Sequence, residues 1–434
     1  MDIYVVQNGD TIDSIASKYG VTVDKLIHDN GSIITVNLVP GQAIVITYPE
    51  QTHIVMAGDT LTSIASTYGI SVMQLLQYNT FLSEREYIYP GESLVIKYST
   101  KGVLSTHGFL YTYINRQTLI KTLPLLSYLS IFNYRITEDY KIDTLGEDSD
   151  LINLALEYGT IPIMMISSSS SQGFPDLELI YEILLNKELQ NQLVSETINI
   201  VKTKGYYGLN VMVSGINTTN QQLYIDLFNN FSTHLKNENL YFFITINLNV
   251  RDTSKDTSRD KLDYSTIGNL VEGIVFLQYY WGTSPGAPIP VNNIPHISSY
   301  VEYVETLMPP EKIIIGLTLI GYDWELPYRY NLSQVYALSL ESVILLAHNV
   351  NATIQFDDTS LTSYFYYQIF NPGGAVDHIV WFIDARSIDY LLELSYEKNI
   401  LGSGIWGIMV FNQQLWSLIC SRYQIIKYIP DNIK

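Results

Sequence analysis

The chain has 434 residues, of which 47% are hydrophobic and 15% are charged. This composition is typical of a folded globular protein, and the length predicts one large domain accompanied by smaller modules. The formal net charge is −19, from 24 basic and 43 acidic residues that are spread along the sequence. Binding to nucleic acid or to an anionic membrane surface needs clustered lysine and arginine, so we expect neither kind of partner.

Cysteine and histidine usage excludes several further classes of site. The single cysteine, Cys420, rules out an intramolecular disulfide framework and lies in an apolar helical run, where a buried structural thiol is expected. The histidines form no HxxxH or HxH pair, and no phosphate-binding loop is found, so we expect no metal and no cofactor. The first residues, MDIYVVQNGD, lack a basic segment and a long apolar stretch, so no secretory signal is expected.

Two segments near the N-terminus repeat each other, because residues 4–46 match residues 53–96. Each copy predicts the order strand, helix, helix, strand. A β-branched run stops at Gly-Asp-Thr, where the Asp or the Thr can cap the first helix, and a Tyr-Gly pair ends that helix in a left-handed conformation. We therefore expect two small domains, residues 1–49 and 50–99. The matching positions are Gly9-Asp10-Thr11 with Gly58-Asp59-Thr60, Tyr19-Gly20 with Tyr68-Gly69, Asn30 with Asn79, and Pro40-Gly41 with Pro90-Gly91.

This pattern resembles the LysM module in both copies. The resemblance implies binding of peptidoglycan, chitin or another N-acetylglucosamine polymer, between the loop after the first strand and the loop before the last. The same residue types also suit capping and turning, so a purely structural role stays open for each side chain, and the loop backbones are the better candidates for contact. The glycan-binding residues implied are Gly9, Asp10, Thr11, Asn30 and Gly41 in the first copy, and Gly58, Asp59, Thr60, Asn79 and Gly91 in the second.

From Val103 onward, apolar strand-like runs alternate with helical stretches, which predicts an α/β fold with a parallel sheet. The number of strands fits a TIM (β/α)8 barrel over residues 100–434, with an α+β insertion at about 322–382 that contains a helix over 332–348. The expected strands are 103–111, 126–133, 159–166, 206–213, 240–248, 272–280, 312–319 and 402–409, and the expected helices include 148–158, 177–204 and 220–237.

The segment GYYGLNVMVSG, residues 205–215, has the form of a buried parallel strand, in which Leu209, Val211 and Val213 alternate with Asn210, Met212 and Ser214. It resembles the fourth barrel strand of family 18 glycoside hydrolases, whose pattern is DxxDxDxE, and its opening is similar to the spore cortex-lytic branch of that family. The resemblance covers nearly all of residues 101–434, and two LysM copies ahead of the barrel are usual in that branch. Further landmarks are LSIFNY at 129–134, LQYYWG at 277–282, GYDW at 321–324, IQFD at 354–357 and VWFIDARS at 380–387.

The resemblance implies a chemistry that this strand lacks. In family 18 the glutamate protonates the glycosidic oxygen, and the neighbouring aspartate orients the substrate's own acetamido group for attack. The matching positions hold Ser214 and Met212, and Tyr207 stands at the outermost aspartate. Neither serine nor methionine can act as the general acid, so we expect no catalytic residue on this strand. The nearby carboxylates considered as substitutes are Asp323, Glu325, Asp357, Asp358 and Asp384, of which Asp384 is expected to cap a helix.

Aromatic groups suited to sugars remain. Tyr279 and Trp406 match the substrate-contacting tyrosine of the family and the tryptophan at the floor of its central subsite. Trp281, Tyr322 and Trp324 are expected at the rim of the cleft, where ring faces can stack on pyranose C–H surfaces. Packing in the core is the alternative for Trp406 and Tyr322.

These observations favour a non-catalytic, spore-associated protein that binds peptidoglycan, with the glycosidase-like barrel used for binding or scaffolding. Two alternatives stay open. One is a self-assembling spore coat or exosporium protein, whose partners would be other spore-layer proteins or itself. The other is an active N-acetylglucosaminidase whose catalytic acid has moved elsewhere. Without a signal peptide, we expect synthesis in the cytoplasm and a final place in the spore coat, at the cortex surface or in the exosporium.

Overall fold

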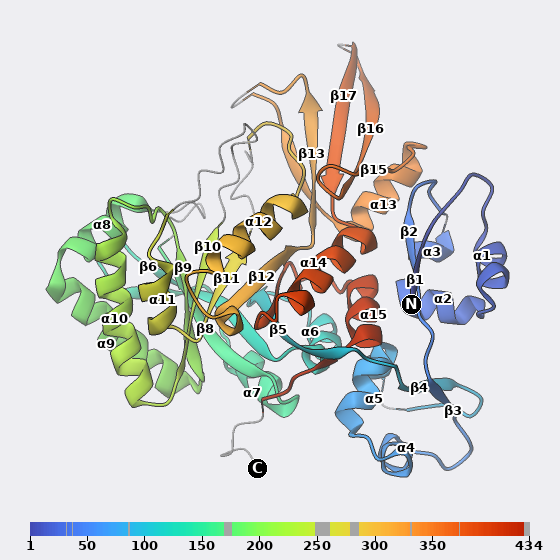
Figure 1. Ribbon diagram of the computed structural model, residues 1–434, viewed down its shortest axis with the longest axis horizontal. Coiled ribbons are helices and arrows are strands. Elements are labelled where there is room, and N and C mark those ends of the chain that lie inside the picture. The colour runs from blue at the N-terminus through green and yellow to red at the C-terminus, as the bar shows by residue number, and fades with distance from the viewer. Residues whose placement is uncertain are drawn as a thin grey trace.

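The computed structural model describes residues 1–434 except 32, 37, 86, 169–175, 248–260, 278–285, 330–331, 373 and 429–434. Each N-terminal repeat forms a two-stranded antiparallel sheet with its helices between the strands in sequence (Figure 1). The predicted order is confirmed, with α3 and η1 as short additions. The first module contains β1 (Asp2–Val5), α1 (Ile12–Tyr19), α2 (Val23–Asn30), α3 (Ile33–Val36) and β2 (Ala43–Ile46). The second contains β3 (Gln51–Ile54), α4 (Leu61–Tyr68), α5 (Val72–Tyr78), the 3-10 helix η1 (Thr80–Glu84) and β4 (Ser93–Lys97).

Threonine rather than aspartate caps the first helix of each module. The Thr11 and Thr60 hydroxyls accept the backbone N–H groups three residues later at 3.1 and 3.0 Å, in a reciprocal capping box. Asp10 and Asp59 instead close the preceding loop, each accepting a backbone N–H at 2.7 Å. The helices end at glycines with φ of 65° and 67°, as the Tyr-Gly pairs predict.

Eight parallel strands close into a barrel, which confirms the TIM-barrel prediction. Each predicted strand overlaps one that the structure contains. The barrel strands are β5 (Gly102–Tyr111), β6 (Tyr128–Ile136), β8 (Ile161–Ser167), β9 (Gly208–Val213), β10 (Tyr241–Asn247), β11 (Gly273–Leu277), β12 (Ile313–Thr318) and β18 (Gly402–Trp406). Two short strands extend this sheet, β7 (Ile142–Thr144) beside β6 and β19 (Tyr423–Ile425) beside β5.

Helices cover the outside of the barrel (Figure 1). The region predicted as a single helix over 177–204 consists of two, because the Asn186 side chain accepts the N–H groups of Glu188 and Leu189 and starts a new helix. None of the helices in the described part of the chain combines the length and apolar character needed to cross a membrane. The covering helices are α6 (Arg116–Thr122), α7 (Ser149–Glu157), α8 (Leu177–Leu185), α9 (Lys187–Lys204), α10 (Gln221–Asn237), α11 (Tyr264–Leu270), α12 (Ile294–Val304), α14 (Ala385–Glu397) and α15 (Gln413–Arg422), with 3-10 turns η2 (Leu123–Leu125) and η3 (Pro310–Lys312).

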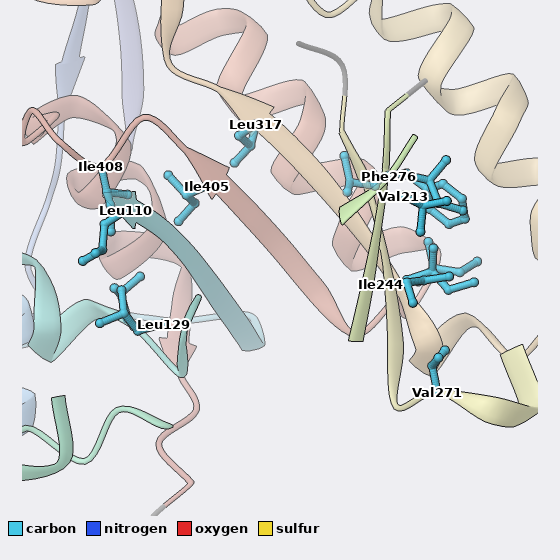
Figure 2. Packing of buried hydrophobic residues seen from close by; sticks show 14 of the residues in the cluster. Leu110, Leu129, Val213, Ile244, Val271, Phe276, Leu317, Ile405 and Ile408 are labelled. Carbon is cyan, nitrogen blue, oxygen red and sulfur yellow. The ribbon is translucent and has the colours of Figure 1, made fainter. Parts of the chain in front are cut away.

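Alternation along the strands builds two apolar layers. Outward side chains such as Leu110, Ile244 and Ile405 belong to the large cluster beneath the helices, and Figure 2 shows members of it on strands from different parts of the barrel. Inward side chains, among them Met212 and Phe243, fill the barrel interior. Because the interior is a packed core, a ligand site has to lie at the end of the barrel.

The insertion follows β12 and stands at the C-terminal end of the barrel strands, at the top of Figure 1. Its five antiparallel strands have the order β14, β13, β17, β16, β15. The prediction of a helix over 332–348 is wrong for its first part, since residues 335–339 pair with β13 and the helix begins only after Ser339 caps it. The elements are β13 (Ile320–Leu326), β14 (Val335–Ser339), α13 (Leu340–Asn349), β15 (Gln355–Asp357), β16 (Thr362–Asn371) and β17 (Gly374–Phe382).

Candidate functional site: an aromatic cavity at the C-terminal end of the barrel

β9 turns Asn210 and Met212 inward, and Ser214 follows just beyond its C-terminal end. Met212 is only 3% exposed and packs in the interior cluster. Ser214 is half-buried, and its backbone carbonyl accepts the Tyr224 hydroxyl at 2.5 Å. Tyr207 precedes the strand, so it lies at the opposite end of β9 from the candidate site.

Carboxylates are missing from the barrel walls as a whole. None of the eight barrel strands, over the ranges given above, contains an aspartate or a glutamate. A carboxyl that protonates a leaving oxygen at the C-terminal end would therefore have to come from outside these strand ranges.

A polar network replaces charge inside the barrel. Asn210 donates from Nδ2 to Ser130 Oγ at 3.1 Å and accepts from Thr245 Oγ1 at 2.9 Å. His107 Nε2 is hydrogen-bonded to the same Ser130 hydroxyl at 2.7 Å. Complete burial lowers the pKa of His107 to about 3, so its imidazole is neutral at physiological pH. The network links β5, β6, β9 and β10 without any ionised group.

Four of the carboxylates considered as substitutes have structural partners, including Glu325, which accepts the Gln334 N–H at 3.5 Å. Asp323 is buried on the face of the insertion sheet that α13 covers, where it accepts Tyr367 Oη at 2.5 Å and pairs with His378 Nδ1 at 3.0 Å. Glu325, two residues further along β13, lies on the same face as Asp323. Asp357 accepts N–H groups of the following turn, and these bonds hold its pKa below the usual range against partial burial. Asp384 caps α14 and pairs with Arg386, while Asp358 is exposed.

The candidate site is a cavity of about 220 Å³ beside Trp406, at the C-terminal ends of β5, β6 and β18. Its described walls are mostly apolar. The Tyr111 ring lies 5.0 Å from that of Phe132 and 6.4 Å from that of Trp406, both edge to face. Exposed Tyr113 stacks on Tyr111 with a centroid separation of 5.5 Å. Such rings suit the apolar face of a pyranose.

The structure places the predicted aromatic residues in different surroundings, some at the cavity and some in the core of the insertion. Trp406 lines the cavity, whereas Tyr322 and Trp324 are 3% and 0% exposed and form the core of the insertion, with Trp324 Nε1 donating to Gly286 O at 3.0 Å. Their rings present no open face to a glycan in the described structure. Tyr279 and Trp281 lie outside the described residues. Tyr111, Tyr113 and Phe132 were missed, although aromatic residues at the ends of two predicted strands were a usable signal.

In the LysM modules the predicted asparagines are buried. Asn30 exchanges two hydrogen bonds with the backbone of Val45, both 2.7 Å, and Asn79 does the same with Val95 at 2.8 and 2.7 Å. Gly9, Gly41, Gly58 and Gly91 all have positive φ and make turns. The asparagine side chains thus shape the loops from inside the modules.

Groups of side chains that could hold a metal ion are not found among the described residues. Cys420 is buried, and burial raises the pKa of its thiol far above neutrality, so it remains an uncharged core group.

Comparison with known proteins identifies both parts of the chain. The LysM domain model matches residues 4–47 and 53–97, and the Glycosyl hydrolases family 18 model matches residues 132–409. The chain is 31% identical over 435 residues to a cortical fragment-lytic enzyme of Bacillus subtilis (strain 168), covering 98% of this chain and 99% of that one. An enzyme of the same name from Bacillus anthracis is 29% identical with the same coverage.

Solved structures also match this chain in fold. The Bacillus cereus spore cortex-lytic enzyme SleL matches with a TM-score of 0.78 at 27% identity, covering 98% of both chains. A chitinase from Chromobacterium violaceum, 16% identical with a TM-score of 0.64 over 74% of this chain and 98% of that one, shares the fold.

These relatives correct the expectation of a non-catalytic binding protein with a glycosidase-like barrel. Proteins that match over the whole length, both modules included, are named as lytic enzymes. The expectation rested on Met212 and Ser214, and the relatives favour the alternative of an active enzyme whose catalytic acid lies elsewhere. With two LysM domains at its start, the chain belongs to family 18 of the glycosyl hydrolases.

Proposed function

We propose that this protein is a lytic glycosidase that acts on peptidoglycan fragments of the bacterial spore cortex. The observation that carries the proposal is the match to cortical fragment-lytic enzymes, with 31% identity over 98% of the chain. In this proposal the LysM region, residues 1–99, holds N-acetylglucosamine-containing glycan, residues 100–434 cleave it, and the protein works in association with the spore.

The cavity beside Trp406 is the proposed sugar-binding subsite. It lies at the end of the barrel where loops converge, and its rings offer stacking faces while the adjacent interior is uncharged. A neutral pyranose with an N-acetyl group fits such surroundings better than a phosphorylated ligand, because none of the described residues that line this cavity is basic.

The proton donor is proposed to be a loop carboxyl rather than a strand residue. Parallel strands end at one face of the barrel, and β10 is the neighbour of β9. The segment that follows β10 in the sequence contains three aspartates, Asp252, Asp256 and Asp260, which are the first candidates to test. They lie outside the described residues.

The test is release of reducing ends from purified cortical fragments by the full chain. Release is expected, and one of the three Asp→Asn variants should lower its rate by about two to four orders of magnitude. Asp150→Asn is the matched control, since Asp150 is exposed in the first turn of α7 on the outside of the barrel. Fragments that bind but yield no reducing ends would contradict the proposal.

A further inference from the structure

The loop before β2 in the first LysM domain is buried against the barrel insertion. Pro40 O accepts the Ile354 N–H at 2.9 Å, and Gly41 O accepts Arg386 Nη2 at 3.3 Å. Val39 is 1% exposed and shares an apolar cluster with insertion residues that include Phe365. A β-carbon at Gly41 would lie 1.8 Å from Ile354 O. This stretch of the loop therefore has no room for a sugar.

The matching loop of the second LysM domain is open. A β-carbon built on Gly91 would meet no atom of the described residues within 4 Å. Tyr89, in the place of Val39, is 58% exposed. Met56, on the loop after β3, is 65% exposed, and Gly91 N–H donates to Val55 O at 2.8 Å, which holds the two loops side by side.

The open loops carry groups that suit a sugar. Tyr87 and Tyr89 are both exposed, and the Arg85 guanidinium lies 5.6 Å from the Tyr89 ring while pairing with Glu92 at 2.6 Å. An aromatic ring beside hydrogen-bonding side chains offers stacking and polar contacts together.

The way each module docks to the barrel explains why the loop before the last strand is buried in the first module and exposed in the second. Both modules attach to α15. Gln414 Nε2 donates to Asn30 Oδ1, at the end of α2, at 2.9 Å, and Thr80 Oγ1, at the start of η1 just after α5, donates to Gln413 Oε1 at 3.1 Å. Among the described residues, the turn just before the last strand contacts the insertion in the first module, through Pro40 and Gly41, whereas the matching position Gly91 is open.

We propose that the second LysM domain alone binds glycan in this protein, and that the first is a docking element whose glycan-side loop is committed to the insertion. This inference rests on the proposed function, because it names the module that holds the substrate. The glycan then binds on the face of the second LysM domain that is formed by the loops at residues 55–59 and 87–91.

The test uses the full chain and a linear hexamer of N-acetylglucosamine, read out by amide hydrogen exchange. Protection is expected at residues 55–60 and 87–91 but not at residues 7–11. Tyr89→Ala should weaken the protection-derived affinity by about three- to tenfold, the loss expected for one stacked ring, and Met56→Asp should also weaken it. Gln7→Asp, at the position matching Met56 and likewise exposed, is the control and should leave the affinity unchanged.

Equal protection of residues 7–11, or unchanged affinity of the Tyr89→Ala and Met56→Asp variants, would overturn the inference. The two proposals fail in different ways. Protection at the second module without release of reducing ends contradicts the proposed hydrolysis alone, whereas release without that protection contradicts this inference alone.

Discussion

Gly41 and Gly91 occupy one position of a repeat in two different surroundings. Both have positive φ, 85° and 94°, so alanine at either costs roughly 1 kcal/mol of backbone strain. At Gly41 the new methyl group also overlaps a backbone carbonyl, which cannot rotate away. We expect Gly41→Ala to lower the free energy of unfolding by about 1–3 kcal/mol more than Gly91→Ala, in denaturant titrations. Equal losses would mean that the loop of the first module is not held against the insertion.

His107 gives the barrel interior a pH dependence. Its pKa is about 3 in the folded state against 6.5 in a model peptide. Between these values the unfolded chain binds a proton that the folded chain does not, so stability falls as pH falls. From pH 7 to pH 5, wild type should lose about 2 kcal/mol more of its unfolding free energy than His107→Gln does.

Chemical denaturation at several pH values measures this difference. The glutamine variant is a suitable reference because its amide can still bond to Ser130 but does not titrate. Parallel pH profiles for the two proteins would show that the imidazole gains its proton without unfolding.

At the scale of the element, β9 supports the barrel but is not expected to carry the proton transfer. Ser214 contributes its carbonyl to Tyr224, and that bond is independent of the side chain. We therefore expect Ser214→Ala to release reducing ends from cortical fragments at a rate within about twofold of wild type, since serine is no general acid. A rate lowered by two orders of magnitude would mean that the Ser214 side chain takes part in catalysis.

The barrel strands could be predicted because buried parallel strands appear as short apolar runs between helices. Boundaries inside the insertion and between α8 and α9 were harder, since they depend on single caps at Ser339 and Asn186. Val335 and Tyr336, with high strand propensity, were the overlooked signal for β14.

The candidate site was less accessible from sequence than the fold. Whether a ring lines a cavity depends on barrel closure and on what the insertion covers. For this reason Trp406 lines a cavity wall, whereas Trp324 is buried in the core of the insertion. The sequence also did not reveal that the LysM copies are inequivalent, because it does not show that the insertion covers Val39 while Tyr89 stays exposed.

At the scale of the whole molecule, the modules and the barrel should unfold together. Gln413 and Gln414 tie both modules to α15, and Figure 1 shows this helix beside α2 and α5. We expect one calorimetric transition for wild type and a separate, earlier transition for the Gln413→Ala/Gln414→Ala double variant. Gln222→Ala, on exposed α10 surface, is the control and should unfold as wild type does. Two transitions in wild type would show that docking adds little stability.

The position of α15 so late in the sequence has a consequence for biosynthesis. Both modules leave the ribosome well before α15, the helix on which they rest. Until then both modules lack their hydrogen bonds to Gln413 and Gln414. Strand β5 likewise lacks its neighbours β18 and β19. The final arrangement of the glycan-binding end is therefore set only after α15 has been synthesised, and a chain that stops before residue 413 would lack the α15 contacts of both modules.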